Sequence, residues 1–224
     1  EDIPAATQLF TPRWIVEYMV QNTVGKLWLQ NRPNSKIKDF MPYYLDSPSA
    51  TSDDYLKLNS VEEIKLLDPA CGSGHILVYG FELLYQIYEE EGYSPNEIPE
   101  LIIKNNLFGL EIDERASQLA GMALMMKARS KSRRFFRKET KPNIITFRDF
   151  DYDSEEVEKV FKRSNILMPD TIHGDLELMA QASNYGSLIQ PKTELAELIK
   201  IKSYLEKALI TDNVFNQTKI IELS

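Results

Sequence analysis

A turn rich in small residues interrupts an apolar run in the first half of the chain. The sequence LLDPACGSGHIL, residues 66–77, places Asp68, Gly72 and Gly74 between two apolar segments. Glycine lets a ligand approach the backbone closely, and a carboxylate accepts hydrogen bonds from a cation or from hydroxyl groups. The residue types indicate a binding turn, with a tight strand-to-helix turn that binds nothing as the simplest alternative.

The spacing in this turn excludes two common nucleotide-binding turns. A P-loop has four residues between its glycines, followed by Lys and Ser or Thr, whereas Gly72 and Gly74 are separated by one residue and His75 follows. A dinucleotide fingerprint needs a third small residue where this chain has Leu77, and an acid about 20 residues further on. The acid that ends the next predicted strand, Glu111, lies well beyond that distance.

A ligand with an ammonium group and a nucleoside, but no phosphate, fits the two acids better. Asp68 can accept hydrogen bonds from the ammonium group, and Glu111 can accept two from adjacent ribose hydroxyls.

Both acids end predicted strands of one sheet. From residue 64 the pattern alternates between strand and helix. Strands are predicted in 63–69, 106–113 and 142–150, with long helices over 75–92 and 114–131 and a short helix over 96–106. Such an order gives parallel strands joined by helical crossovers, with ligands at the carboxyl ends of the strands. The predicted fold class is therefore α/β, an open Rossmann-like sheet.

The rest of the chain is predicted to flank this core. Thr11 is expected to cap a helix of about five turns with Pro12 in its first position. We expect four parts: an N-terminal helix (1–30), an irregular connection (31–60) whose DFMPYYL run packs onto the core, the core itself (61–151) and helical or irregular material (152–224). In the last part, Gly174 and Gly186 are expected to mark loops.

These motifs carry a family resemblance. DPACGSGHIL together with FGLEIDERASQLA resembles the first two motifs of S-adenosylmethionine-dependent DNA adenine (N6) methyltransferases, and LFTPRWIVEYMV resembles the Phe-Thr-Pro helix that precedes them. MPYYL, GMALMMKARS and YGSLIQP are similar to the BREX phage-defence methyltransferases (PglX) and to fused restriction–modification enzymes. The resemblance covers roughly residues 6–192 and implies a truncated methyltransferase fold with S-adenosylmethionine as cofactor.

The resemblance also implies site residues. Glu111 would hold the ribose, Ile112 would lie on the cofactor adenine with Asp113 nearby, and Asp149, or else Asp175, would contact that adenine. The residues expected to close over the methionine end of the cofactor are Phe10, Thr11 and Pro12. Those expected to line it are Asp68, Pro69, Ala70, Cys71, Gly72, Ser73 and Gly74.

The catalytic loop of that family, of the Asn-Pro-Pro-Tyr type, does not occur in this sequence, whose prolines are never adjacent. In the family this loop accepts hydrogen bonds from the adenine amino group and stacks on the flipped base. We therefore expect a fragment without catalytic residues that binds cofactor and transfers no methyl group. The full-length protein is expected to methylate adenine in a specific site of double-stranded DNA, within a restriction–modification or phage-defence system whose other subunits are candidate partners. The alternatives are an RNA or small-molecule methyltransferase and a non-catalytic cofactor-binding module.

Composition sets further limits. The formal net charge of −8 argues against a surface that binds nucleic acid throughout, and the single cysteine excludes an internal disulfide. No apolar run reaches the roughly 20 residues that span a bilayer, so we expect a cytoplasmic protein without membrane contact. The two histidines, His75 and His173, are far apart, and no metal site is expected. Cys71 and the Met run GMALMMKAR are both expected to pack in the core.

One segment stands out against the acidic background. Residues 127–141 hold eight Lys or Arg and one Glu, with Phe135 and Phe136 among them. These cations could neutralise DNA phosphates, or they could be the solvated end of a helix, where cations are favourably placed. The sequence leaves both interpretations open.

Overall fold

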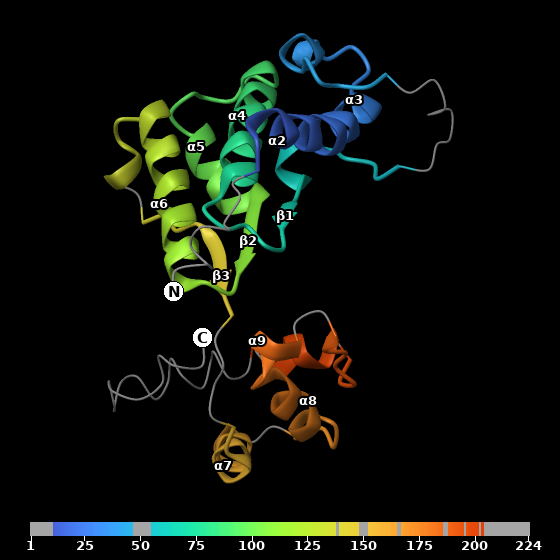
Figure 1. The fold of residues 1–224 in the computed structure, drawn as a ribbon, viewed down its shortest axis with the longest axis vertical. Coiled ribbons are helices and arrows are strands. Elements are labelled where there is room, and N and C mark those ends of the chain that lie inside the picture. The colour runs from blue at the N-terminus through green and yellow to red at the C-terminus, as the bar shows by residue number, and fades with distance from the viewer. Residues whose placement is uncertain are drawn as a thin grey trace, which may run out of the picture. The chain divides into compact units, whose positions relative to one another are not determined.

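The computed structural model describes residues 11–46, 55–137, 139–147, 152–164, 167–185, 188–194, 196–201 and 203. The chain divides into two compact units, 1–147 and 148–224 (Figure 1).

Three parallel strands form the sheet of the first unit, as the alternating pattern predicts. The strands are β1 (Leu66–Asp68), β2 (Leu107–Glu111) and β3 (Asn143–Thr146), in the order β1-β2-β3. The register pairs Asp68 with Gly109 and Glu111 with Thr146. The predicted α/β fold with parallel strands is therefore confirmed.

Two long helices cover one face of this sheet. They are α4 (His75–Glu90) and α6 (Glu114–Lys131). Leu77 of α4 is fully buried next to Gly109, where a Cβ would lie 3.0 Å from it, so the strand glycine allows the close approach. In α6, the Ser117 hydroxyl lies 2.7 Å from the Thr146 hydroxyl of β3. On the opposite face, Leu67 and Ile145 are 53% and 60% exposed.

The remaining elements of the first unit are short. Helix α5 (Ile98–Leu101) continues into a π-helical turn, Ile102–Asn106, that leads into β2. The 3₁₀ turns are Lys36–Phe40, Val61–Glu63 and Phe135–Arg137. Met41, in the DFMPYYL run, is buried in the main core, which confirms that this run packs onto it.

The N-terminal helix begins one residue later than predicted. Helix α2 (Arg13–Val20) is followed by a π-helical turn, Gln21–Gly25, and by α3 (Lys26–Asn31), whose Trp28 is fully buried. Pro12 occupies the N-cap with a non-helical ψ of 142°, and its carbonyl accepts the first helical hydrogen bonds. No side chain caps the helix, so the prediction that Thr11 does so is wrong.

The predicted burial of the Met run is also wrong in part. Met122 and Met126 are 63% and 53% exposed, and Met125 alone of the three packs partly against the core. The buried face of α6 consists instead of the smaller side chains Ser117, Ala120, Leu124 and Ala128. Small residues recurring at helical spacing let α6 approach the sheet closely, which turns the longer methionines outward.

The second unit is helical in its described parts. It contains α7 (Ser154–Ser164), α8 (Ile172–Met179), α9 (Ala182–Tyr185) and helical residues 196–201. Its small core brings together Phe161, Ile172 and Ile201. Gly174 lies inside α8 and marks no loop, which corrects the prediction, while Gly186 lies outside the described residues. None of the helices described in either unit is long and apolar enough to cross a membrane.

Candidate functional site

The predicted binding turn connects β1 to α4 and is tied to the neighbouring strand. The backbone N–H of Cys71 donates to the carbonyl of Leu110 in β2 over 3.0 Å, and that of Gly74 donates to the carbonyl of Cys71 over 2.7 Å. Gly74 has a positive φ of 85°, and a Cβ there would lie 2.9 Å from Cβ of Ala120 in α6. Packing alone therefore requires a glycine at position 74, because it lets the start of α4 lie against α6.

Glu111 closes the turn from the end of β2. One carboxylate oxygen accepts from the N–H of Gly72 over 2.6 Å, and the other accepts from the N–H groups of Ile112 (2.9 Å) and Asp113 (3.0 Å). Three backbone donors thus hold one half-buried carboxylate between two strand ends. A carboxylate has about four acceptor sites, and the three N–H groups use both sites of Oε1 and one of Oε2, so Oε2 can still accept one hydroxyl group.

Asp68 is buried at the end of β1, with 7% of its surface exposed. Its carboxylate accepts from the N–H of Ala70 over 3.2 Å. Burial raises the pKa of Asp68, the Ala70 hydrogen bond partly opposes this, and the nearby Glu111 carboxylate raises it further. Two carboxylates close enough to interact would both be stabilised by a ligand cation beside them.

The turn between these acids is open at Gly72. Gly72 has a φ of 51°, and a Cβ there would meet no atom within 4 Å, so its backbone is open to a ligand. Ile112 follows Glu111 and is 67% exposed, which leaves an apolar side chain for a ring to cover. Asp113 caps α6 by accepting from the N–H groups of Arg115 and Ala116. The donors and acceptors present therefore fit a ligand with a cation, a diol and an apolar ring.

Cys71 lies in the same turn but points into the protein. It is 6% exposed, and its sulfur lies close to Gly109 of β2. Burial, followed by the charges of Asp68 and Glu111, raises the pKa of this thiol to about 11. A thiol of that kind is a poor nucleophile, which matches the predicted packing role.

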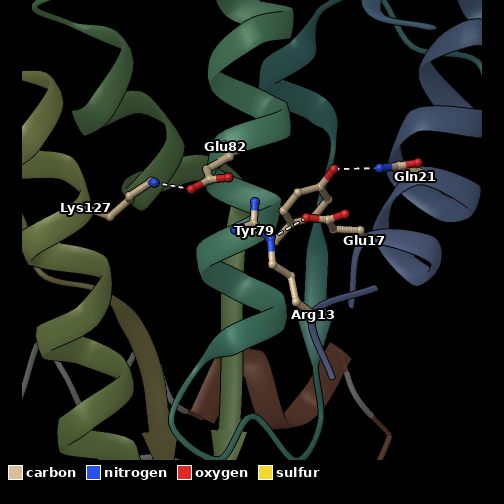
Figure 2. Close-up of polar contacts among 6 residues, drawn as sticks. All are labelled: Arg13, Glu17, Gln21, Tyr79, Glu82 and Lys127. Atoms are coloured by element: carbon tan, nitrogen blue, oxygen red, sulfur yellow. Dashed lines mark hydrogen bonds and ion pairs between the residues drawn. The ribbon is translucent and has the colours of Figure 1, made fainter. Parts of the chain in front are cut away.

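Helix α2 is placed beside the turn by a buried glutamine. Gln21 is fully buried and donates from Nε2 to the Tyr79 hydroxyl over 2.7 Å (Figure 2). Its Oε1 accepts the N–H of Tyr43 over 2.7 Å. Further along the same helical segment, Gly25 lies next to Leu83 of α4. The residue numbers rise together in the two contacts, so α2 and α4 run in the same direction.

This direction puts the start of α2 near the turn. Counting back about two turns from the Gln21–Tyr79 contact brings Arg13 level with the turn that precedes α4. Pro12 is next to Arg13 in sequence, and the closing role of Thr11 and Pro12 stays a prediction. Sequence reasoning missed Gln21, although a polar residue inside the apolar stripe of a predicted helix was a usable signal.

A groove lies elsewhere in the first unit and contains its own ion pairs. The groove, of about 550 Å³, runs between α2, α4 and α6. Four of its charged side chains form ion pairs, Arg13 with Glu17 over 2.6 Å and Lys127 with Glu82 (Figure 2), and Lys131 lies 4.2 Å from the centroid of the Tyr85 ring. We therefore regard the open turn as the candidate site.

The structure brings together the predicted residues 68–74 and 111–113. Phe10 and Asp149 lie outside the described residues. The alternative candidate Asp175 is buried in the second unit, where its carboxylate accepts from the N–H groups of Lys192 and Thr193, each over 2.8 Å. That carboxylate has a structural use, in anchoring the segment after α9. In the described part of the chain, no three His, Cys, Asp or Glu side chains gather as a metal site.

Comparisons with known proteins agree with the motifs. Residues 49–146 match the model of the MmeI DNA-methyltransferase domain. The chain is 49% identical over 164 residues to the adenine-specific methyltransferase BrxX of Escherichia coli O9:H4 (strain HS), a match covering 70% of this chain and 14% of that protein. It is 44% identical over 156 residues to the adenine-specific methyltransferase PglX of Lacticaseibacillus casei (strain Zhang), covering 64% and 13% respectively.

The chain also matches a solved structure, the ATP-dependent Type ISP restriction-modification enzyme LlaBIII bound to DNA. The match covers 78% of this chain and 9% of the LlaBIII chain, with a TM-score of 0.40 and 16% sequence identity. The chain thus spans about one seventh of the length of the two methyltransferases it matches. The resemblance that the motifs indicate is confirmed by the domain and sequence matches.

Proposed function

We propose that this chain is the S-adenosylmethionine-binding part of a DNA methyltransferase that acts on the exocyclic amino group of adenine. The observation that carries the proposal is the pair of carboxylates at the ends of β1 and β2, with Glu111 fixed across the glycine turn by three backbone N–H groups. The similarity to two adenine-specific methyltransferases supports the choice of cofactor and of target base.

The acids and Ile112 of the candidate site would each have a defined task. Asp68 would accept hydrogen bonds from the ammonium group of the cofactor, and its charge would be better stabilised with that cation present. Glu111 would hold the ribose through the acceptor site left on Oε2, and Ile112 would cover one face of the cofactor adenine. Asp149 remains the proposed partner of the adenine edge.

The start of α2 would cover the methionine end of the cofactor. The pairing of Gln21 with Tyr79 supports this, because it holds α2 level with the turn. The residues proposed to close over the cofactor are Phe10, Thr11 and Pro12. The cofactor supplies a sulfonium methyl group, and the task of this chain is to fix its orientation, since methyl transfer depends mainly on positioning.

The target and the partners are also proposals. The whole protein would act on double-stranded DNA and belong to a restriction–modification or phage-defence system, as the names of its relatives suggest. The sequence contains no Asn-Pro-Pro-Tyr loop. We therefore propose that the chain alone binds cofactor without methylating DNA.

Isothermal titration calorimetry with S-adenosylmethionine tests the proposal. We expect saturable binding of one molecule per chain, competition by S-adenosylhomocysteine, and no binding of NAD⁺ or ATP. The Glu111→Ala variant should lose most of the affinity, whereas Glu89→Ala, at the opposite end of α4, should keep it. Absence of saturable heat with the folded wild-type chain would contradict the proposal, and transfer of a labelled methyl group to duplex DNA would contradict the claim that the chain alone is inactive.

A further inference from the structure

Helix α6 exposes a row of apolar side chains on the side away from the sheet. Leu119, Met122 and Met126 are 57%, 63% and 53% exposed, and their spacing puts them on one helical face. The sheet-facing residues of α6, such as Ala120 and Leu124, lie on the opposite face. Just beyond α6, the Phe136 side chain is 54% exposed. In Figure 1, α6 lies at the outer side of the first unit, away from α2.

Positive charge is concentrated at the far end of α6 and in the turn after it. Residues 127–137 hold six Lys or Arg and no acid, in a chain of net charge −8. Lys127 pairs with Glu82 and Lys131 lies over the Tyr85 ring, so the four arginines are the cations left for a partner. The guanidinium of Arg129 lies 6.0 Å from the Phe136 ring, which joins the apolar row to the basic end. Within the described residues, Arg133, Arg134 and Arg137 make no ion pair with a carboxylate.

These cations are carried on a fixed backbone. Phe135 is 1% exposed and inserts into the main core, and Ser132 is 3% exposed. The N–H of Phe135 donates to the carbonyl of Ser132 over 3.0 Å, and that of Arg137 donates to the carbonyl of Arg134 over 2.9 Å. The arginines on either side of Phe135 are therefore exposed along an anchored 3₁₀ turn, and little backbone ordering is needed before a partner binds.

Position and composition favour a protein partner over the phosphate backbone of target DNA. The 18 residues of α6 rise about 27 Å from the carboxyl ends of the strands, where a target base would approach the proposed cofactor site, to the basic end. Phosphates would leave the apolar row uncovered. An apolar centre of Met, Leu and Phe with arginines at its edge is the composition of a protein–protein interface.

We propose that this surface, formed by Leu119, Met122, Met126, Arg129, Arg133, Arg134, Phe136 and Arg137, binds an acidic amphipathic protein segment. The apolar side of the partner covers the row on α6, and its carboxylates pair with the arginines. An exposed apolar row in a soluble domain marks a contact surface when charge is concentrated beside it. The choice of a protein over DNA rests in part on the proposed function, whereas peptide binding to this surface does not depend on methyl transfer or on cofactor binding.

A designed peptide tests this surface directly. The probe is a fluorescein-labelled amphipathic helix of about 18 residues, leucine on one face and glutamate on the other, measured by fluorescence anisotropy with the full chain. We expect saturable binding, about tenfold weaker with Met122→Ser/Met126→Ser and about tenfold weaker with Arg133→Glu/Arg134→Glu. A matched peptide with lysine for glutamate should not bind.

Controls separate this surface from general stickiness and from unfolding. Leu56→Ser changes another exposed apolar side chain and should leave peptide affinity unchanged. Equal urea midpoints of the variants and the wild-type chain establish that the fold is intact. The proposal is overturned if the acidic peptide does not bind the wild-type chain, or if binding is indifferent to both double variants. It is also overturned if a DNA duplex, rather than the peptide, loses affinity in Arg133→Glu/Arg134→Glu.

Discussion

The two ends of α6 carry opposite charge, and the protein holds the two sets of charges in different ways. At the start, Glu111 and Asp113 accept hydrogen bonds from backbone N–H groups, so their carboxylates are fixed in place. At the far end, the arginines project from a backbone that is anchored from beneath by Phe135. A carboxylate fixed by the backbone suits a small ligand of one shape, whereas long side chains on an anchored turn can adapt to a macromolecule.

The largest expected effect is on stability, and it differs between Gly72 and Gly74, the two glycines of the binding turn. Gly74→Ala should lower the free energy of unfolding by about 3 kcal/mol, because the new Cβ meets Ala120 and φ is positive. Gly72→Ala should lower it by about 1 kcal/mol, since φ is positive but the space around it is open. Urea denaturation followed by circular dichroism measures both, and equal losses would mean that the contact with Ala120 is unimportant.

The second effect concerns the charge that holds the turn. Glu111→Gln keeps the shape of the side chain but weakens hydrogen bonds that depend on a charged acceptor, so affinity for S-adenosylmethionine should fall about tenfold or more. Calorimetry measures the affinity, and the urea midpoint shows whether the turn itself has loosened. Glu89→Gln, an exposed change at the other end of α4, should alter neither quantity.

The third effect is a dependence on pH. Burial raises the pKa of Asp68, so this group takes up a proton at a higher pH than an ordinary aspartate does. The protonated form attracts a ligand cation less, and cofactor affinity should therefore fall as pH drops through that raised pKa. Asp68→Asn should bind more weakly at neutral pH and lose this pH dependence. An unchanged profile in the variant would assign the titration to another group.

The smallest expected effect lies at the basic end. Arg133→Glu/Arg134→Glu should leave the urea midpoint and the affinity for S-adenosylmethionine unchanged, because these side chains are exposed and make no ion pair within the described residues. A clear loss of stability would show that the arginines support the fold, and the contrast between the two ends of α6 would then fail.

The sequence predicts the strands and the turn because their patterns are local. An acid followed by small residues between a strand and a helix is sufficient to place Asp68 and Gly72, and the fold follows from the order of elements. The burial of the Met run cannot be predicted from local pattern. Whether Met122 faces the sheet or solvent depends on which side of α6 packs, and the buried side is formed by Ser117, Ala120, Leu124 and Ala128. Gly174 shows the same limit, since a glycine is tolerated inside α8 where nothing crowds it.

The link between α2 and α4 could be read only from the structure. Gln21 satisfies its amide through Tyr79 and through the backbone of Tyr43, two partners that are distant in sequence. No periodicity indicates such a pairing. The hydrogen bond between Gln21 and Tyr79 nevertheless decides which end of α2 lies beside the candidate site.

The two tryptophans have an optical consequence. Trp28 of α3 is fully buried, whereas Trp14, in the first turn of α2, is 56% exposed and lies near the candidate site. The native emission should be the sum of a shielded fluorophore and one that iodide can quench. Replacing Trp14 with Phe would leave Trp28 as a reporter of unfolding, and the difference between the two proteins would isolate a signal for ligands that arrive beside α2.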